Sequence, residues 1–416
     1  MVTMKKTYIV RESIVLVRDL AEPDEEEREF IFIIIIFFIF FYFKMSWKTL
    51  RQITTGGLGE QTQISGNYAI VSDPFFNVAQ DNDGQIRIYE RKSNGDWDQV
   101  YVRTGNSGAQ AFFGSSVAIS GNYAIAGEHA FANDSGRARF YERKNGTWEE
   151  TQIIASPQGV GQQFSFGRGV AVSGNLAAVG APGAFAGGAG PGRVYWYRRN
   201  PGNGNWEQVG DPVDGNYNLN AGGQFGYNIK MSGNYAIIGE FGFGGAAVIT
   251  GNGRAYWYEY CDGSWSQVFF DGGKVPQMTF GWGVGINGNY AIVGAPGVTG
   301  QGAANNPGFA YIYERKSNGD WELVESLRGE NNTDLFGEWV SVSGSYAMVG
   351  APRVNGGSGR IYFYQRKRDG KWERIQTDTG IAGGNQLLGY SLSIDGNYAI
   401  GGGYLNGIVR FYQKGV

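Results

Sequence analysis

The sequence predicts an all-β chain, a seven-bladed β-propeller built from four-stranded antiparallel blades. Three observations lead to this prediction. The phrase SGNYAI, or a close variant of it, occurs seven times at nearly regular intervals. Alternating aromatic segments and a tryptophan follow most copies of the phrase. The last unit lacks the tryptophan segment that ends the other units, and a segment of that kind precedes the first unit.

The repeated phrase predicts the first two strands of each blade. Its central glycines are separated by 52 to 59 residues; they are Gly66, Gly121, Gly174, Gly233, Gly288, Gly344 and Gly396. In the second unit, Gly-Asn lies between the apolar runs 116–120 and 123–126. Such a dipeptide between two apolar runs indicates a two-residue hairpin whose first position needs a positive φ. We therefore expect an apolar second strand that is buried on both faces.

The third and fourth strands follow in the same unit. Aromatic residues alternate in Arg193–Tyr197, Arg254–Tyr258 and Arg360–Tyr364, which indicates strands covered on both faces. Tight turns of Asn-Gly or Asp-Gly come next, at 94–95, 145–146, 262–263, 318–319 and 369–370. We expect both turn residues to be left-handed. A tryptophan then begins the fourth strand, as Trp97, Trp148, Trp206, Trp265, Trp321 or Trp372. Four such strands every 55 residues or so are typical of a propeller blade.

The ring is expected to close through the N-terminal strand Trp47–Ile53. The seventh unit, from Leu388, has its third strand at Ile408–Tyr412 and no fourth strand after it. Trp47–Ile53 has the form of a fourth strand and no other strands of its own. Pairing it with the last blade would remove the exposed edge that a linear array leaves.

Residues 1–44 form a separate, non-propeller segment before the predicted propeller at 45–416. An acidic run, Asp24–Glu29, precedes an apolar run, Phe30–Phe43, of 14 residues. That run is shorter than the roughly 20 residues that span a bilayer, and its acidic flank does not suit a secretory signal. One interpretation is translated upstream sequence, with Met45 as the start. The other is a short anchor, in which case residues 30–43 contact a membrane.

Composition excludes several classes of function. Lys and Arg number 35 and Asp and Glu 38, so the net charge is −3 and no basic field exists to bind nucleic acid. Cys261 is the sole cysteine, which excludes an intrachain disulfide and a cysteine-based metal cluster. The glycine-rich stretch Ala184–Gly192 lacks the lysine of a phosphate-binding loop, and we expect no cofactor.

Two polar candidates are weak. Asp81 and Asp83 lie in an Asp-Asn-Asp-Gly segment that offers oxygen ligands for calcium, but no bidentate glutamate follows. A polar turn without a metal is the expectation there. His129, the only histidine, follows Glu128 at the end of a second strand. No nucleophile is identified beside it, so we interpret it as a solvated loop residue.

Apolar aromatics gather in the long loops of blades one to four. The 2–3 and 4–1 loops share one face of a propeller, and there the sequence places Phe75, Phe76, Phe131, Phe185, Phe241 and Phe243. Exposed aromatics on a rigid scaffold are common binding anchors, so these six are the candidate ligand-binding residues. The alternative is that they fold back over the ends of the blades.

The repeats resemble a known family. FG occurs at 113–114, 166–167, 225–226, 280–281 and 336–337, and GAP at 180–182, 294–296 and 350–352. In these motifs Trp47–Val416 resembles the FG-GAP repeats of the integrin α-subunit propeller and of bacterial surface proteins. The resemblance implies adhesion or ligand binding at the cell surface or outside the cell. The integrin-type calcium loop is missing, so the repeats resemble the short, calcium-less form.

These observations lead to a prediction of a non-enzymatic binding module. We expect a monomer that recognises a protein or glycan through its long-loop face. Its location is extracellular or at the cell surface by the resemblance, or cytoplasmic if Met45 is the start. The alternatives are a propeller-based hydrolase or lyase and a structural spacer in a surface assembly. An enzyme would need acid–base residues at the central channel, where we expect the second strands to offer mainly Ala, Ile, Val and Gly.

Overall fold

The computed structural model describes residues 8–10, 13–15, 46–77, 82–105, 110–159, 164–183, 191–215, 223–242, 252–273, 278–297 and 306–415. The chain divides into two units, Met1–Trp47 with Lys414–Val416, and Lys48–Gln413. In the first unit, β1 (Tyr8–Val10) and β2 (Ser13–Val15) pair as an antiparallel hairpin. The predicted apolar run 30–43 lies outside the described residues. Within the described part of the chain, no helix has the length and apolar character that a membrane span requires.

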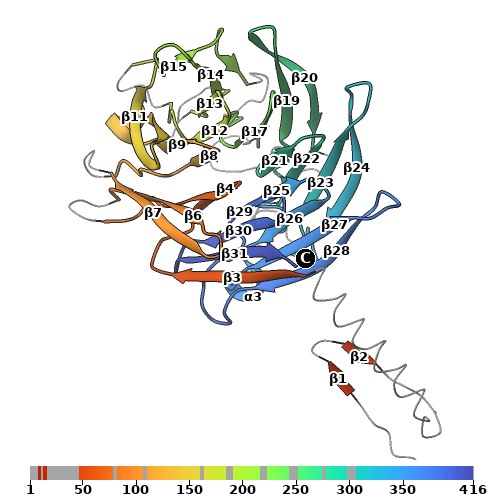
Figure 1. The fold of residues 1–416 in the computed structure, drawn as a ribbon. Coiled ribbons are helices and arrows are strands. Elements are labelled where there is room, and N and C mark those ends of the chain that lie inside the picture. The colour runs from red at the N-terminus through yellow and green to blue at the C-terminus, as the bar shows by residue number, and fades with distance from the viewer. Residues whose placement is uncertain are drawn as a thin grey trace, which may run out of the picture. The chain divides into compact units, whose positions relative to one another are not determined.

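The second unit is a seven-bladed propeller of four-stranded antiparallel blades, as predicted (Figure 1). Blade 1 consists of β4 (Gln61–Ser65), β5 (Tyr68–Asp73), β6 (Gln85–Arg91) and β7 (Trp97–Thr104). Blade 2 consists of β8 (Val117–Ser120), β9 (Tyr123–Glu128), β10 (Arg137–Lys144) and β11 (Thr147–Ala155). Blade 3 consists of β12 (Gly169–Ser173), β13 (Leu176–Ala181), β14 (Arg193–Arg199) and an outer strand in two parts, β15 (Trp206–Gln208) and β16 (Val213–Asp214). Blade 4 consists of β17 (Ile229–Ser232), β18 (Tyr235–Glu240), β19 (Arg254–Cys261) and β20 (Ser264–Gly272).

Blades 5 to 7 repeat the same order. They are β21 (Val284–Asn287), β22 (Tyr290–Ala295), β23 (Phe309–Arg315), β24 (Trp321–Arg328); β25 (Val340–Ser343), β26 (Tyr346–Ala351), β27 (Arg360–Arg366), β28 (Trp372–Thr379); and β29 (Ser391–Asp395), β30 (Tyr398–Gly403), β31 (Ile408–Lys414) with β3 (Trp47–Thr54). Short helical turns, α2 (Phe131–Asp134) and α3 (Val354–Gly357), lie between the second and third strands of blades 2 and 6.

The predicted ring closure is confirmed. Strand β3 is the outer strand of the last blade and pairs with β31, seen in Figure 1 as an orange-red strand beside a blue one. The Nε of Arg410 donates to Oε1 of Gln52 at 2.8 Å, and the amide of Gly415 donates to the carbonyl of Ser46 at 2.8 Å. Trp47 is buried, whereas much of the rest of β3 is exposed. The strand therefore adds one edge and one aromatic side chain to the blade.

The repeated phrase links each blade to the next. Its glycine has a φ between +55° and +58° in all seven copies, as the hairpin requires. The residue before the glycine accepts a hydrogen bond from the phrase of a neighbouring blade. The oxygen acceptors and amide donors are Ser65 and Gly121, Ser120 and Gly174, Ser232 and Gly288, Ser343 and Gly396, and Asp395 and Gly66. The last pair joins blade 7 to blade 1.

The FG and GAP glycines are needed for close packing between blades. Gly167, with φ +92°, donates its amide to the carbonyl of Gly180 in its own blade at 2.9 Å. A Cβ on Gly180 would lie 2.0 Å from the carbonyl oxygen of Gly226, the FG glycine of the next blade. The same close approach joins Gly402 of blade 7 to Gly59 of blade 1. No other residue fits here, because any side chain would push the blades apart.

Aromatic side chains fill the space between blades. In five blades the tyrosine of the phrase packs against the fourth-strand tryptophan of the next blade, as Tyr290 does edge-on to Trp372 at 5.7 Å. The Tyr290 hydroxyl donates to Glu314 at 2.8 Å, and the Arg366 guanidinium lies over its ring. Each aromatic pair adds about 0.5–1.5 kcal/mol beyond the buried area. The interfaces between blades are therefore the core of this protein.

Two local predictions need correction. Both turn residues are left-handed at Asn145-Gly146 and Asp262-Gly263, but at 94–95, 318–319 and 369–370 only the glycine is. Strands β6 and β7 are joined by five residues, not two, and the Lys92 amide donates to the Asp96 carbonyl across a wider loop. The channel is lined by the first strands, not the second. Each first strand is an edge of its sheet and contacts the first strands of both adjacent blades.

Candidate active site

One side chain from every blade occupies the same place, directly before the first strand and after the glycine of the FG motif, or of Leu-Gly in blades 1 and 7. The seven side chains, which we call the mouth ring, are Glu60, Ser115, Arg168, Tyr227, Trp282, Glu338 and Tyr390. Because the first strands surround the channel, residues at this position meet at its long-loop end. The glycine before them is the same in every blade, whereas the residue at this position is acidic, basic, aromatic or a serine.

Arg168 is the cation of the mouth ring. Its Nη2 donates to the Tyr227 hydroxyl at 2.7 Å, and its Nη1 donates to the Ser115 carbonyl at 3.2 Å. Its guanidinium also lies 4.5 Å from the centre of the Tyr227 ring. In turn, the Tyr227 ring packs against Trp282 at 6.0 Å. These contacts join four consecutive blades and fix the orientation of the guanidinium.

Glu60 and Glu338 are the two acids of the mouth ring. Their exposed fractions are 7% and 8%, and Oε2 of each lacks a hydrogen-bond partner among the described residues. Burial raises the pKa of Glu60 from 4.5 to about 7, although Arg168 acts to lower that pKa. Burial likewise raises the pKa of Glu338 to about 7, with Arg353 acting to lower it. Both carboxyls therefore exist in protonated and ionised forms near neutral pH.

Three tyrosines lie within electrostatic reach of both acids. Burial raises the pKa of Tyr227, Tyr390 and Tyr404, and the charges of Glu60 and Glu338 add to each increase. Tyr390 packs against Tyr404 with ring centres 4.6 Å apart. The two carboxyls thus face a common set of phenol groups, which makes the mouth ring one site.

His129 belongs to the same region; it lies in the turn after β9, as expected, but is only partly exposed. The ring stacks on Phe112 at 5.6 Å, and its Nδ1 is buried without a hydrogen-bond partner in the described part of the chain. Burial lowers the pKa of His129 from 6.5 to about 3, and Arg168 lowers it further. The imidazole is therefore neutral at neutral pH.

The predicted aromatic anchors are in different environments. Phe75 is 43% exposed and packs edge-on to Phe112 and against Tyr404. Phe76 is partly buried, as is Phe131, which lies under the Arg137 guanidinium. Phe241 is fully buried against Tyr227 and Trp282, so it supports the mouth ring and presents no surface to a ligand. Phe185 and Phe243 lie outside the described residues.

The structure offers no cluster of metal ligands among the residues that it describes. Asp83 is buried in the described part of the loop, and Asp81 falls in the segment that is not described. The aromatic rings, the two acids and the arginine at the mouth ring are suited to an organic substrate rather than to a hard cation, which prefers several oxygen ligands.

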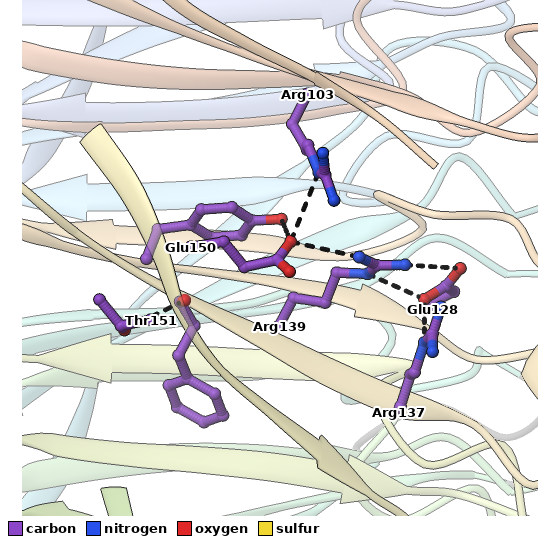
Figure 2. Close-up of polar contacts among 8 residues, drawn as sticks. Arg103, Glu128, Arg137, Arg139, Glu150 and Thr151 are labelled. Atoms are coloured by element: carbon purple, nitrogen blue, oxygen red, sulfur yellow. Dashed lines mark hydrogen bonds and ion pairs between the residues drawn. The ribbon is translucent and has the colours of Figure 1, made fainter. Parts of the chain in front are cut away.

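A second group of charges is centred on blade 2, and Arg103 joins it from β7 of blade 1 (Figure 2). Arg139 forms ion pairs with Glu128 at 3.0 Å and with Glu150 at 3.2 Å. Arg137 also pairs with Glu128, and Arg103 with Glu150 at 3.5 Å. Neither Glu128 nor Arg139 is accessible to a ligand, since their side chains are 0% and 2% exposed. This cluster is therefore part of the folded framework.

Comparison with known proteins supports the fold. No family model matches the chain, and no curated protein sequence is significantly similar. A crystal structure from Bacteroides uniformis ATCC 8492, provisionally named 6-phosphogluconolactonase, matches with a TM-score of 0.51 and 12% identity over 77% of this chain and 88% of that one. The periplasmic gluconolactonase of Pseudomonas aeruginosa matches with a TM-score of 0.48 and 13% identity over 77% and 85%.

These findings define the chain as a seven-bladed β-propeller with a charged, aromatic channel mouth. They do not confirm the FG-GAP family. The prediction of a non-enzymatic protein is wrong, because the Bacteroides structure that matches this fold is named as an enzyme. The expectation that acid–base groups are lacking at the channel is also wrong, because Glu60 and Glu338 lie at its mouth beside the cation Arg168. These residues lie at a position that varies between units, so the constant motifs of the repeat do not indicate them.

Proposed function

We propose that the chain is a hydrolase that opens small esters or lactones of hydroxy acids at the mouth ring. The observation that supports this most is the pair of buried acids, Glu60 and Glu338, each with a pKa of about 7 and one oxygen without a partner among the described residues. A carboxyl group with such a pKa can accept a proton or donate one at neutral pH, which is what ester hydrolysis requires.

The charges near each acid suggest their roles. Arg168 favours the ionised form of Glu60, which suits that residue as the general base. Glu60 would take a proton from water as the water oxygen adds to the carbonyl carbon. The Arg168 guanidinium would stabilise the resulting oxyanion. As the bond to the alkoxy oxygen breaks, Glu338 would give its proton to that oxygen, leaving a carboxylic acid and an alcohol.

A cyclic ester of a sugar acid is the substrate class that we favour. Tyr227 and Tyr390 lie within electrostatic reach of both acids, and Trp282 packs against Tyr227. Such aromatic surfaces with a few polar groups are common in small-molecule sites. The Bacteroides structure is named as a 6-phosphogluconolactonase, and the lactone in that name is a substrate of this class. Within the class we include both phosphorylated and unphosphorylated lactones.

Hydrolysis of glucono-1,5-lactone and of 6-phosphoglucono-1,5-lactone, followed by acid release in a pH-stat, tests the proposal. We expect the protein to exceed spontaneous hydrolysis for at least one of them. Replacing Glu60 or Glu338 by Gln should lower kcat by about 10²–10⁴-fold, the usual contribution of a general acid or base. Glu149→Gln, on the exposed outer strand β11, is the matched control and should retain full activity.

Two results would contradict the proposal. One is a rate equal to the spontaneous rate for both lactones with folded protein. The other is hydrolysis that survives unchanged in both glutamine variants, which would place the reaction elsewhere.

The FG and GAP residues still support a narrower proposal about the repeat itself. We propose that the units are of the FG-GAP type, because the glycines of both motifs have the interlocking role described above. The adhesive function that this resemblance implies is not part of the proposal.

A further inference from the structure

A separate cavity lies inside the channel, below the mouth ring. Its volume is about 160 Å³, and its wall is made by the first strands of all seven blades. The turn residue Gly233 contributes to the wall and is exposed, so the cavity reaches the short-turn face. Arg168 does not line it and faces a smaller pocket of about 10 Å³ nearer the mouth. Lys230 lines both spaces.

Lys230 is the cation of this cavity. It lies on β17, between Ile229 and Met231, and no hydrogen bond or ion pair joins its side chain to any of the described residues. Most other blades place a small residue at the equivalent position, such as Ala118, Ala171 or Gly285. The long side chain therefore enters a space that its neighbours leave open.

Gln63 enters the same cavity from blade 1. Its Oε1 is buried and has no hydrogen-bond partner among the described residues. An amide oxygen without a donor is costly to bury, because it loses its hydrogen bond to water. A ligand that carries a hydroxyl group would supply that donor, while its negative charge would meet the Lys230 ammonium.

Serine hydroxyls complete the wall. Ser65, Ser120, Ser232, Ser341 and Ser393 line the cavity, and each oxygen accepts a backbone N–H from an adjacent blade. None of these hydroxyls donates to an acceptor within the described residues. Because the oxygen is already an acceptor, the O–H remains available as a donor to a bound anion.

The charges around Lys230 leave it without a counter-ion. Asp395 is the carboxylate of the cavity wall, and its Oδ2 accepts the Gly66 amide at the short-turn end. The strands that pack against β17 are β12, β13, β18 and β21; of these, only β18 carries a charged residue, Glu240, at its far end. Arg168 lines the smaller pocket with Lys230. Burial lowers the pKa of Lys230 from 10.5 to about 8.

We infer that this cavity is a binding site for a small hydroxycarboxylate, held by Lys230, Gln63 and the serine hydroxyls. The carboxylate would pair with the ammonium and accept from the serines, and the hydroxyl would donate to Gln63. The cavity volume suits a ligand of this size, because a protein cavity of about 150 Å³ can hold benzene. Lactate has as many non-hydrogen atoms as benzene. The inference does not depend on the proposed hydrolysis, since it concerns binding in another part of the channel.

Titration calorimetry of the full chain with lactate tests the inference. We expect saturable binding at pH 7 that weakens about tenfold by pH 9, because the bound anion needs a protonated Lys230. Lys230→Met should weaken it at least tenfold, and Lys230→Gln serves if the methionine variant does not fold. Lys316→Met, on the surface hairpin of blade 5, should bind as the wild type does.

Propionate, which lacks the hydroxyl group, tests the part of Gln63. It should bind several-fold more weakly than lactate to the wild type, and Gln63→Leu should remove that difference. The inference is overturned if the wild type gives no binding heat with lactate, if lactate binds the Lys230 variants as tightly, or if affinity is unchanged between pH 7 and 9. Equal affinity for propionate and lactate would exclude the hydroxycarboxylate.

Discussion

Two groups of buried charges in this propeller differ in their partners. In blade 2, Arg139 joins Glu128 and Glu150 into a paired cluster (Figure 2). At the mouth ring, Glu60 and Glu338 are buried almost as deeply, yet each retains an oxygen without a partner among the described residues. Burial alone therefore does not distinguish a structural charge from a functional one. The distinguishing property is whether the neighbours stabilise the ionised form.

The comparison predicts that breaking the paired cluster has the larger effect on stability. Arg139→Met should lower the free energy of unfolding by up to about 3–5 kcal/mol, because it removes the buried cation that Glu128 and Glu150 share and leaves each with one arginine partner. Urea unfolding monitored by tryptophan fluorescence would measure this. Arg193→Met removes a more exposed pair with Asp214 and should change the free energy by no more than about 1 kcal/mol. Equal effects of the two substitutions would contradict the structural role of the cluster.

Replacing an acid of the mouth ring should instead increase the free energy of unfolding. The folded-state pKa of Glu338 is about 7 against 4.5 unfolded, so its favourable contribution is complete below pH 4.5 and is lost as the pH rises towards 7. Glu338→Gln should therefore gain up to about 3 kcal/mol of stability relative to the wild type between pH 4.5 and 8. Unfolding at both pH values measures this. A difference that does not change with pH would mean that the carboxyl is not protonated in the folded state.

His129 should give a smaller effect of opposite sign. Its folded-state pKa is about 3 against 6.5 unfolded, so its contribution is present above pH 6.5 and is lost as the pH falls from 6.5 towards 3. Between pH 7 and pH 5 the wild type should lose about 2 kcal/mol relative to His129→Gln. Thermal unfolding at the two pH values would detect it. If the histidine is solvated, the two proteins will respond to pH alike.

The sequence predicted the fold because its signals are local or countable. The Gly-Asn turn, the alternating aromatics and the missing fourth strand after Tyr412 are read from neighbouring residues and from the number of units. The turn at 94–95 was predicted wrongly because loop width depends on how the flanking strands end. Asn94 accepts the Asp96 amide through its side chain, which stabilises a wider loop with only the glycine left-handed.

The candidate site was not predicted because it comes from the positions where the repeats differ. Glu60 and Glu338 are almost 280 residues apart and follow the same FG-type glycine in different blades. Aligning the units on that glycine would have shown a charged or aromatic residue in most of them, but not that the first strands bring these residues together. The pKa values of the two acids are also invisible in sequence, since burial sets them.

The closing strand has a consequence for how the chain reaches its folded form. Six blades can assemble from contacts within one unit and its neighbours. The seventh needs contacts such as the hydrogen bond between Gln52 and Arg410, which are 358 residues apart in the sequence. Until β3 docks, β31 offers an open edge that a β3 segment from another molecule could also occupy. Docking within the same chain is favoured by the high effective concentration of a tethered strand. Refolding at high protein concentration should therefore yield strand-exchanged dimers, whereas dilute refolding should yield closed rings.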